Sequence, residues 1–191
     1  MKTALIMIDM QRGFIDPASP IAIPAAAATI PACAQTIRFC HEHDIPVVYA
    51  VRHYRADGSD VERVRHRLWF EGGRPLSEVC DEVMSDAFPE EFEVLDKDRI
   101  IVKPRFSAFF ATNLDLVLRR LGVQTVVLAG TTTPNCIRTT CYDALSLDYD
   151  AVVLSDCTSS VSDTVQESNL ADMQRIGAKI MTSKDWTSIA E

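Results

Sequence analysis

Short apolar runs rich in β-branched residues recur along the chain and predict β-strands. Most of these runs are continuously apolar and do not alternate with polar residues, which is typical of parallel strands covered on both faces. The predicted strands span residues 4–8, 46–51, 99–102, 125–129, 151–154 and, with a weaker pattern, 179–181.

Apolar residues between these runs recur at helical spacing. Ile30, Cys33, Ile37 and Cys40 follow one another at intervals of three or four residues, and a later stripe ends at Gly122, a residue type that commonly terminates helices. The helices predicted from these patterns run over residues 30–40, from an N-terminal cap formed by Thr112 and Asp115 to residue 121, over residues 134–147 and over residues 164–176.

Strands that alternate with helices predict an α/β fold: a three-layer, doubly wound, Rossmann-like arrangement with a mainly parallel sheet of about six strands flanked by helices. A chain of 191 residues suits one well-buried domain, which we expect to span residues 1–191. Residues 54–93 fit this pattern worst because they are polar and rich in glycine and proline. We interpret them as an excursion that carries Trp69 and Phe70, a pair suited to a contact between subunits.

Composition and charge narrow the classes of partner. The chain is 47% hydrophobic and 24% charged, as in soluble globular proteins, and no apolar run approaches the roughly 18 residues of a membrane-spanning helix. A net charge of −8 disfavours nucleic acid as a partner. The first apolar run is broken early by Asp9 and no cleavage site follows, so we expect a cytoplasmic protein. The six cysteines form no C-x-x-C pair and are expected to be thiols, most of them in the core.

Polar side chains at the ends of the predicted strands are the candidates for chemistry. Asp9 follows the first strand, Lys103 follows the strand at 99–102, and residues 131–136 lead from another strand to Cys136. In open parallel sheets, ligands bind beyond the carboxyl ends of the strands. The sequence therefore predicts an acid, a base and a thiol at one edge of the sheet.

Cys136 has the local setting of a reactive thiol. Thr133 is a credible helix N-cap and Pro134 suits the first helical position, so Cys136 falls in the first turn. The helix dipole there, and a nearby ammonium from Lys103, favour the thiolate. Position alone is equally compatible with an ordinary buried cysteine, and Asp9 with Lys103 could be a purely structural ion pair.

Three segments resemble the signature segments of the isochorismatase-like cysteine hydrolases: residues 8–11 (IDMQ), 103–109 (KPRFSAF) and 128–136 (LAGTTTPNC). Their order and spacing match over essentially the whole chain. The resemblance implies that Cys136 is the nucleophile, that Asp9 is the general acid and base, and that Lys103 holds both in register. It also implies a non-proline cis peptide between Thr131 and Thr132, which turns the amides of Thr132 and Cys136 toward an oxyanion.

The nicotinamidases of that family add a metal site built from an Asp-x-His pair and a further histidine. Val51 stands here where the aspartate is expected, and only His53 and His66 remain nearby. We therefore expect no metal and no other cofactor. The resemblance then favours a carbamoyl, ureido or other small linear amide as substrate.

Several residues near the strand ends are candidates for binding that substrate. Arg105, with Arg52 as second choice, is suited to a substrate carboxylate, and aromatic side chains could form an apolar wall. The candidate substrate-binding residues are Gln11, Phe14, Trp69, Arg105 and Phe106.

The favoured hypothesis is therefore a cysteine-dependent hydrolase that cleaves a C–N amide bond through a thioester and releases ammonia or an amine. The alternatives are a metal-dependent nicotinamidase, a vinyl ether hydrolase of the isochorismatase type, which the intact Cys136 argues against, and a non-catalytic binding protein. Members of such families commonly form symmetric assemblies, so we expect a homodimer or a larger homo-oligomer.

Overall fold

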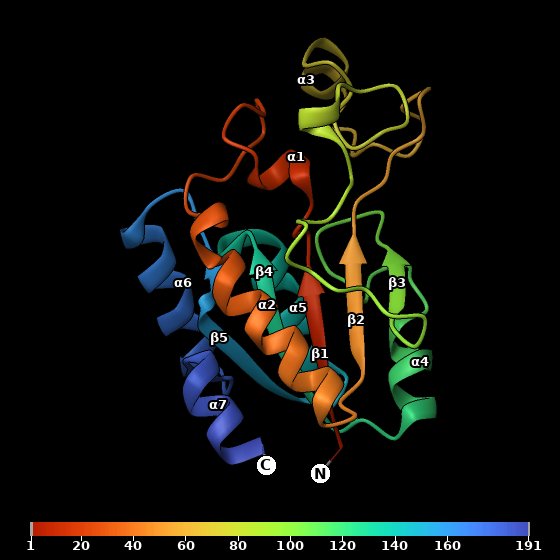
Figure 1. Ribbon diagram of the computed structural model, residues 1–191. Coiled ribbons are helices and arrows are strands. Elements are labelled where there is room, and N and C mark those ends of the chain that lie inside the picture. The colour runs from red at the N-terminus through yellow and green to blue at the C-terminus, as the bar shows by residue number, and fades with distance from the viewer. Residues whose placement is uncertain (1, 191) are drawn as a thin grey trace.

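The computed structural model describes residues 2–190 and is built on one six-stranded sheet in the order β3-β2-β1-β4-β5-β6 (Figure 1). Every neighbouring pair of strands is parallel. The predicted α/β fold with a mainly parallel sheet is confirmed. The strands are β1 (Thr3–Ile8), β2 (Val47–Val51), β3 (Arg99–Val102), β4 (Thr125–Thr131), β5 (Asp150–Ser159) and β6 (Lys179–Met181).

Helices cover both faces of this sheet, because successive side chains of a strand point to opposite sides. In β1, Leu5 and Met7 pack against helices α2 (Ala26–Glu42) and α7 (Ser183–Ala190). Ala4, Ile6 and Ile8 belong to the second core, on the opposite face of the sheet. That core is completed by α4 (Leu114–Leu121), α5 (Arg138–Ser146) and α6 (Asp163–Arg175). Across residues 2–190, no helix combines the length and the apolar content needed to cross a membrane.

Residues 54–93 lie outside the sheet and form the predicted excursion. They contain α3 (His66–Glu71) and η1 (Glu82–Met84), and in Figure 1 they stand beyond the carboxyl ends of β2 and β3. Trp69 is buried in a small cluster of this segment, so the expectation that it lies on a subunit contact is wrong, whereas Phe70 is exposed. These short helices and α1 (Arg12–Ile15) were not predicted because each is too short to show helical periodicity.

Five cysteines, counting Cys136, are buried and Cys80 is half-buried; all six are free thiols. Burial raises the pKa of Cys40 and Cys141 to about 12. These two thiols therefore stay protonated and unreactive at neutral pH. The prediction that most cysteines are core thiols is confirmed.

Gly130 marks a close approach between two strands. It lies next to Ile8 of β1, has a φ of +116°, and a Cβ at this position would overlap the carbonyl oxygen of Ile8. Any side chain here would therefore push apart β1 and β4, the two strands that carry Asp9 and the segment leading to Cys136.

We expect Gly130→Ala to lower the free energy of unfolding by at least about 3 kcal/mol, because it adds steric overlap to a strained backbone. Gly177→Ala is the matched control: its φ is +114° but no atom lies within 4 Å of an added Cβ. The control should lose only about 1–2 kcal/mol. Urea unfolding of both variants measures the difference, and equal losses would show that the close approach has no energetic consequence.

Candidate active site

The carboxyl ends of four neighbouring strands meet at one edge of the sheet. Asp9 follows β1, Arg52 follows β2, Lys103 follows β3, and η2 (Thr133–Ile137), which contains Cys136, follows β4. Together with the excursion, these strand ends enclose a cavity of about 640 Å³. The sequence-based expectation that acid, base and thiol emerge at the same edge agrees with this arrangement.

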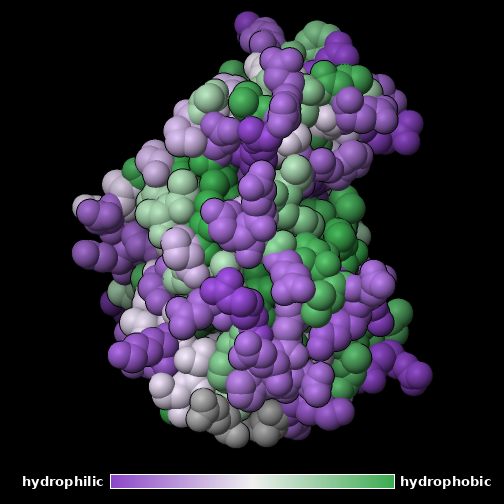
Figure 2. Space-filling view, in the orientation of Figure 1, coloured by the Kyte–Doolittle hydropathy of each residue, from purple (hydrophilic) through white to green (hydrophobic). Residues whose placement is uncertain are grey.

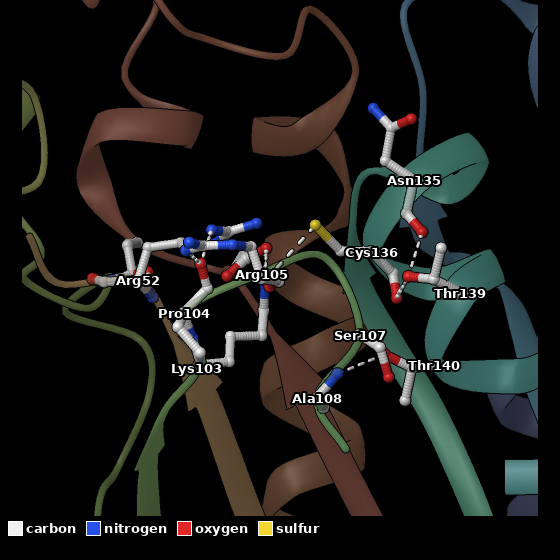
Figure 3. Close-up of polar contacts among 12 residues, drawn as sticks. Arg52, Lys103, Pro104, Arg105, Ser107, Ala108, Asn135, Cys136, Thr139 and Thr140 are labelled. Carbon is white, nitrogen blue, oxygen red and sulfur yellow. Dashed lines mark hydrogen bonds and ion pairs between the residues drawn. The ribbon is translucent and has the colours of Figure 1, made fainter. Parts of the chain in front are cut away.

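Asp9 and Lys103 form a buried ion pair in contact with Cys136. Lys103 Nζ lies 2.8 Å from Asp9 Oδ2 and 3.4 Å from Cys136 Sγ, and it donates to the carbonyl oxygen of Arg105 at 3.3 Å. Figure 3 shows the Cys136 sulfur pointing toward the Lys103 amine. The side chains of Asp9, Lys103 and Cys136 are almost entirely buried, so charges on them interact with little screening by water.

The environment of Cys136 favours the thiol. Burial is the largest cause and raises the pKa of Cys136; the negative charge of Asp9 raises it further, and the positive charges of Lys103 and Arg52 lower it without reversing the direction. The expected effect of Lys103, which favours the thiolate, is present, but burial and the charge of Asp9 outweigh it. The raised pKa favours the protonated thiol, and a thiol becomes a strong nucleophile only after a base removes its proton.

The turn that carries Cys136 differs from the expected helix start. Residues Thr133–Ile137 form a turn of π-helix, and the Thr133 hydroxyl donates to the carbonyl oxygen of Ser159 at 2.9 Å. Thr133 is thus not the N-cap that its position suggested, because its side chain is used to join η2 to β5. The peptide bond between Thr131 and Thr132 is cis, as the resemblance implied.

Arg52 brings a second buried charge pair to the cavity wall. Its Nη1 donates to Glu62 Oε1 at 2.5 Å, to the Tyr54 hydroxyl at 2.9 Å and to the carbonyl oxygen of Pro104 at 3.3 Å. Burial by itself lowers the pKa of Arg52, but the neighbouring negative charges, first that of Asp9, outweigh it and the pKa is raised. Arg52 is therefore a permanent cation close to Asp9 and Cys136.

The candidate substrate-binding residues divide into two groups. Phe14 and Trp69 line the cavity, as expected, but Gln11, Arg105 and Phe106 are absent from the described lining. Gln11 instead bridges to the backbone of Arg52, donating to its carbonyl oxygen and accepting from its amide, both at 2.7 Å. Arg105 is also directed elsewhere, since its Nη1 donates to the carbonyl oxygen of Asp60 at 3.0 Å.

Arg52, the second choice in the sequence, takes the place expected of Arg105. Its position directly after β2 was a usable signal, because it gives Arg52 the same relation to the sheet edge as Asp9. Arg65 also lines the cavity and was missed, since it lies in the irregular excursion where no periodic pattern predicts its direction. Phe106 contributes indirectly: its ring packs against the guanidinium groups of both arginines.

The residues near β2 do not fit a nicotinamidase-type metal site. His53 Nδ1 pairs with Asp86 Oδ2 at 2.7 Å, and the ring of His66 packs beside Trp69 and Phe70. Within residues 2–190, no three His, Cys, Asp or Glu side chains gather closely enough to hold a metal ion. Val51 supplies no ligand at the position where the aspartate was sought.

Three side chains that line the cavity keep a buried polar atom with no hydrogen-bond partner among residues 2–190: Asp9 Oδ1, Arg52 Nη2 and Thr132 Oγ1. Buried polar atoms are almost always hydrogen-bonded. These three atoms are available for hydrogen bonds with a polar ligand in the cavity.

Comparisons with known proteins agree on one family. The family model for the isochorismatase domain matches residues 3–185. A probable inactive nicotinamidase from Arabidopsis thaliana is 35% identical, over 97% of this chain and 94% of its own length. A maleamate amidohydrolase from Pseudomonas putida is 30% identical, over 96% and 84%. The crystal structure of an isochorismatase family protein from Desulfovibrio vulgaris is 36% identical with a TM-score of 0.92, covering 99% of this chain and 98% of that one.

The charges around Cys136 predict opposite effects of two substitutions on its alkylation by iodoacetamide. Asp9→Asn removes a negative charge that raises the pKa of the thiol, so alkylation should begin at lower pH. Lys103→Met removes a positive charge that lowers this pKa, so alkylation should begin at higher pH. Mass spectrometry of the Cys136 peptide across a pH series measures both shifts.

Cys80, half-buried and distant from this pair in sequence, is the internal control and should keep the same alkylation profile in all three proteins. If the pH at which alkylation of Cys136 begins moved in the same direction in both variants, the electrostatic interpretation would be contradicted.

Proposed function

Because this chain belongs to the isochorismatase family, we propose that it is a cysteine-dependent hydrolase that cleaves the C–N amide bond of a small molecule. The observation that carries the proposal is the contact of Lys103 Nζ with both Asp9 and Cys136 at the wall of one cavity. The maleamate amidohydrolase among its relatives supports amide chemistry. The reaction would pass through a thioester on Cys136 and release ammonia or an amine.

In the first half of the proposed reaction, the Cys136 proton moves to the Asp9 carboxylate and the sulfur attacks the carbonyl carbon of the amide. This transfer removes the negative charge that raised the pKa of the thiol, while Lys103 and Arg52 remain positive beside the new thiolate. The amide oxygen becomes an oxyanion, for which we propose the backbone amides of Thr132 and Cys136 as donors. Asp9 then gives the proton to the nitrogen as the C–N bond breaks.

In the second half, water attacks the carbonyl carbon of the thioester while Asp9 accepts one of its protons. The C–S bond breaks, the proton returns to Cys136 Sγ, and the product leaves as a carboxylic acid. Lys103 remains protonated throughout and holds the carboxylate and the sulfur in register. A single carboxylate thus serves as base and then as acid in each half.

The alternative reactions differ in what they require of Cys136. Hydrolysis of a vinyl ether needs no sulfur nucleophile, and nicotinamidase chemistry calls for metal ligands that the residues near β2 do not form. A non-catalytic binding protein is the third alternative, favoured by the description of the Arabidopsis relative as inactive. Amide hydrolysis and nicotinamidase chemistry both need Cys136 for turnover. Vinyl ether hydrolysis and a non-catalytic binding role do not need it.

A panel of small carbamoyl, ureido and other linear amides, scored by ammonia release, tests the proposal. We expect Cys136→Ala to lower turnover of any accepted amide by at least about 10³-fold, because the nucleophile is lost. Cys80→Ala, which changes a half-buried thiol outside the cavity, should turn over like the unchanged protein. Unchanged turnover in Cys136→Ala would refute the mechanism, and no release from the whole panel would favour the binding protein.

We also propose that the chain forms a homodimer or a larger homo-oligomer. The edge strand β3 leaves Ile100 and Val102 exposed at 56% and 52%, on the same face of the sheet as α2 but beyond the strands that this helix covers. Figure 2 shows a hydrophobic area over this part of the molecule. Sedimentation velocity should give at least twice the 21.2 kDa of one chain, and Ile100→Lys should shift the protein toward monomer. A monomer at micromolar concentration would contradict this.

A further inference from the structure

We propose that Arg52 and Arg65 form an anion-binding subsite inside the cavity, which holds a carboxylate of the substrate while Cys136 attacks its amide. That the substrate is an amide rests on the proposed function. That it carries a carboxylate rests on the two arginines alone. The substrate class would then be short carbon chains with an amide at one end and an acid at the other.

Arg52 has one half of its guanidinium fixed and the other half free. Nη1 is held by Glu62, Tyr54 and Pro104, which orients the group, whereas Nη2 is buried and has no partner among residues 2–190. Figure 3 shows this side chain extending from the end of β2 toward Cys136. A buried, permanently charged donor without an acceptor is costly unless a ligand supplies the acceptor.

Arg65 adds a second cation to the same wall. It is half-buried, lines the cavity, and forms no ion pair with any of the described residues. The guanidinium carbons of Arg52 and Arg65 lie 5.5 and 4.8 Å from the centre of the same Phe106 ring. Both guanidinium groups therefore pack against one ring, which limits their freedom to turn away from each other.

The balance of charge in the cavity favours one negative charge on the ligand. Asp9 is compensated by Lys103 and Arg52 by Glu62, which leaves Arg65 without compensation. A single carboxylate would neutralise the site, and its two oxygens match the paired N–H groups of guanidinium. The other cavity walls are largely apolar, with Phe14, Ile21, Val61, Leu68 and Trp69 among them. They suit the carbon skeleton between the acid and the amide.

Equilibrium binding tests this subsite without turnover. Cys136→Ala protein is titrated by calorimetry with three half-amides, which carry a carboxylate at one end and an amide at the other: malonamate, succinamate and glutaramate. It is also titrated with the three corresponding diamides. We expect the best half-amide to bind at least about 10-fold more tightly than its diamide, because only the half-amide offers a charged acceptor. Adding Arg65→Gln should reduce this preference to about threefold or less.

Arg63→Gln is the matched control, since Arg63 is exposed, precedes Arg65 by two positions and lies outside the cavity lining. It should keep the full preference. Arg52 is tested in the double variant Arg52→Gln with Glu62→Gln, which removes both partners of the buried pair and leaves no unpaired charge. Circular dichroism checks its fold, and the preference for half-amides should again fall.

The outcomes separate this inference from the proposed function. Equal binding of half-amides and diamides, or an unchanged preference in Arg65→Gln, would overturn the subsite. If the unchanged protein nevertheless released ammonia from the diamides, amide hydrolysis would stand without it. Tight binding of half-amides that the unchanged protein does not hydrolyse would support the subsite and overturn the proposed function.

Discussion

The buried ion pair between Asp9 and Lys103 is the interaction on which the site depends. Its partners follow β1 and β3, which are not neighbours in the sheet, so the pair spans the end of β2. Two charges withdrawn from water are stable only if they stay together, and losing one partner of such a pair typically costs about 3–5 kcal/mol. The sheet must therefore hold three strand ends in fixed register, and this register also brings Cys136 into contact with Lys103.

A second charge pair extends this arrangement into the excursion. Arg52 at the end of β2 is held by Glu62 and Tyr54, both in residues 54–93. The excursion is thus attached to the carboxyl end of β2 by a buried ion pair as well as by apolar contacts. It also supplies Trp69 and Arg65 to the cavity wall. The charges near the sulfur are arranged in opposing pairs. Moving one proton from Cys136 to Asp9 would therefore remove a negative charge that raises the pKa of the thiol, while the cations that lower it stay in place.

Close backbone packing makes this geometry possible. Gly130 lets β4 approach β1 next to Ile8, one residue before Asp9, and the following Thr131–Thr132 peptide leads into the π-helical turn of Cys136. The Thr133 hydroxyl joins that turn to β5. Cys136, the proposed nucleophile, is thus fixed by contacts of the chain before and after it and by Lys103 at its sulfur.

The sequence by itself determined the strands, the parallel sheet and the edge at which the chemistry gathers. Continuous apolar runs and the polar residues that end them are local features, and the rule that parallel strands end at one edge converts them into Asp9, Lys103 and Cys136 in one place. Only the tertiary structure decided which arginine faces the cavity. Arg52 and Arg105 both follow strands, but Arg52 is turned inward by Glu62 whereas Arg105 bonds to the backbone of Asp60. The tertiary structure also decided the direction in which the pKa of Cys136 is shifted. Burial and the charge of Asp9 outweigh the nearby cations, and local sequence does not reveal this balance.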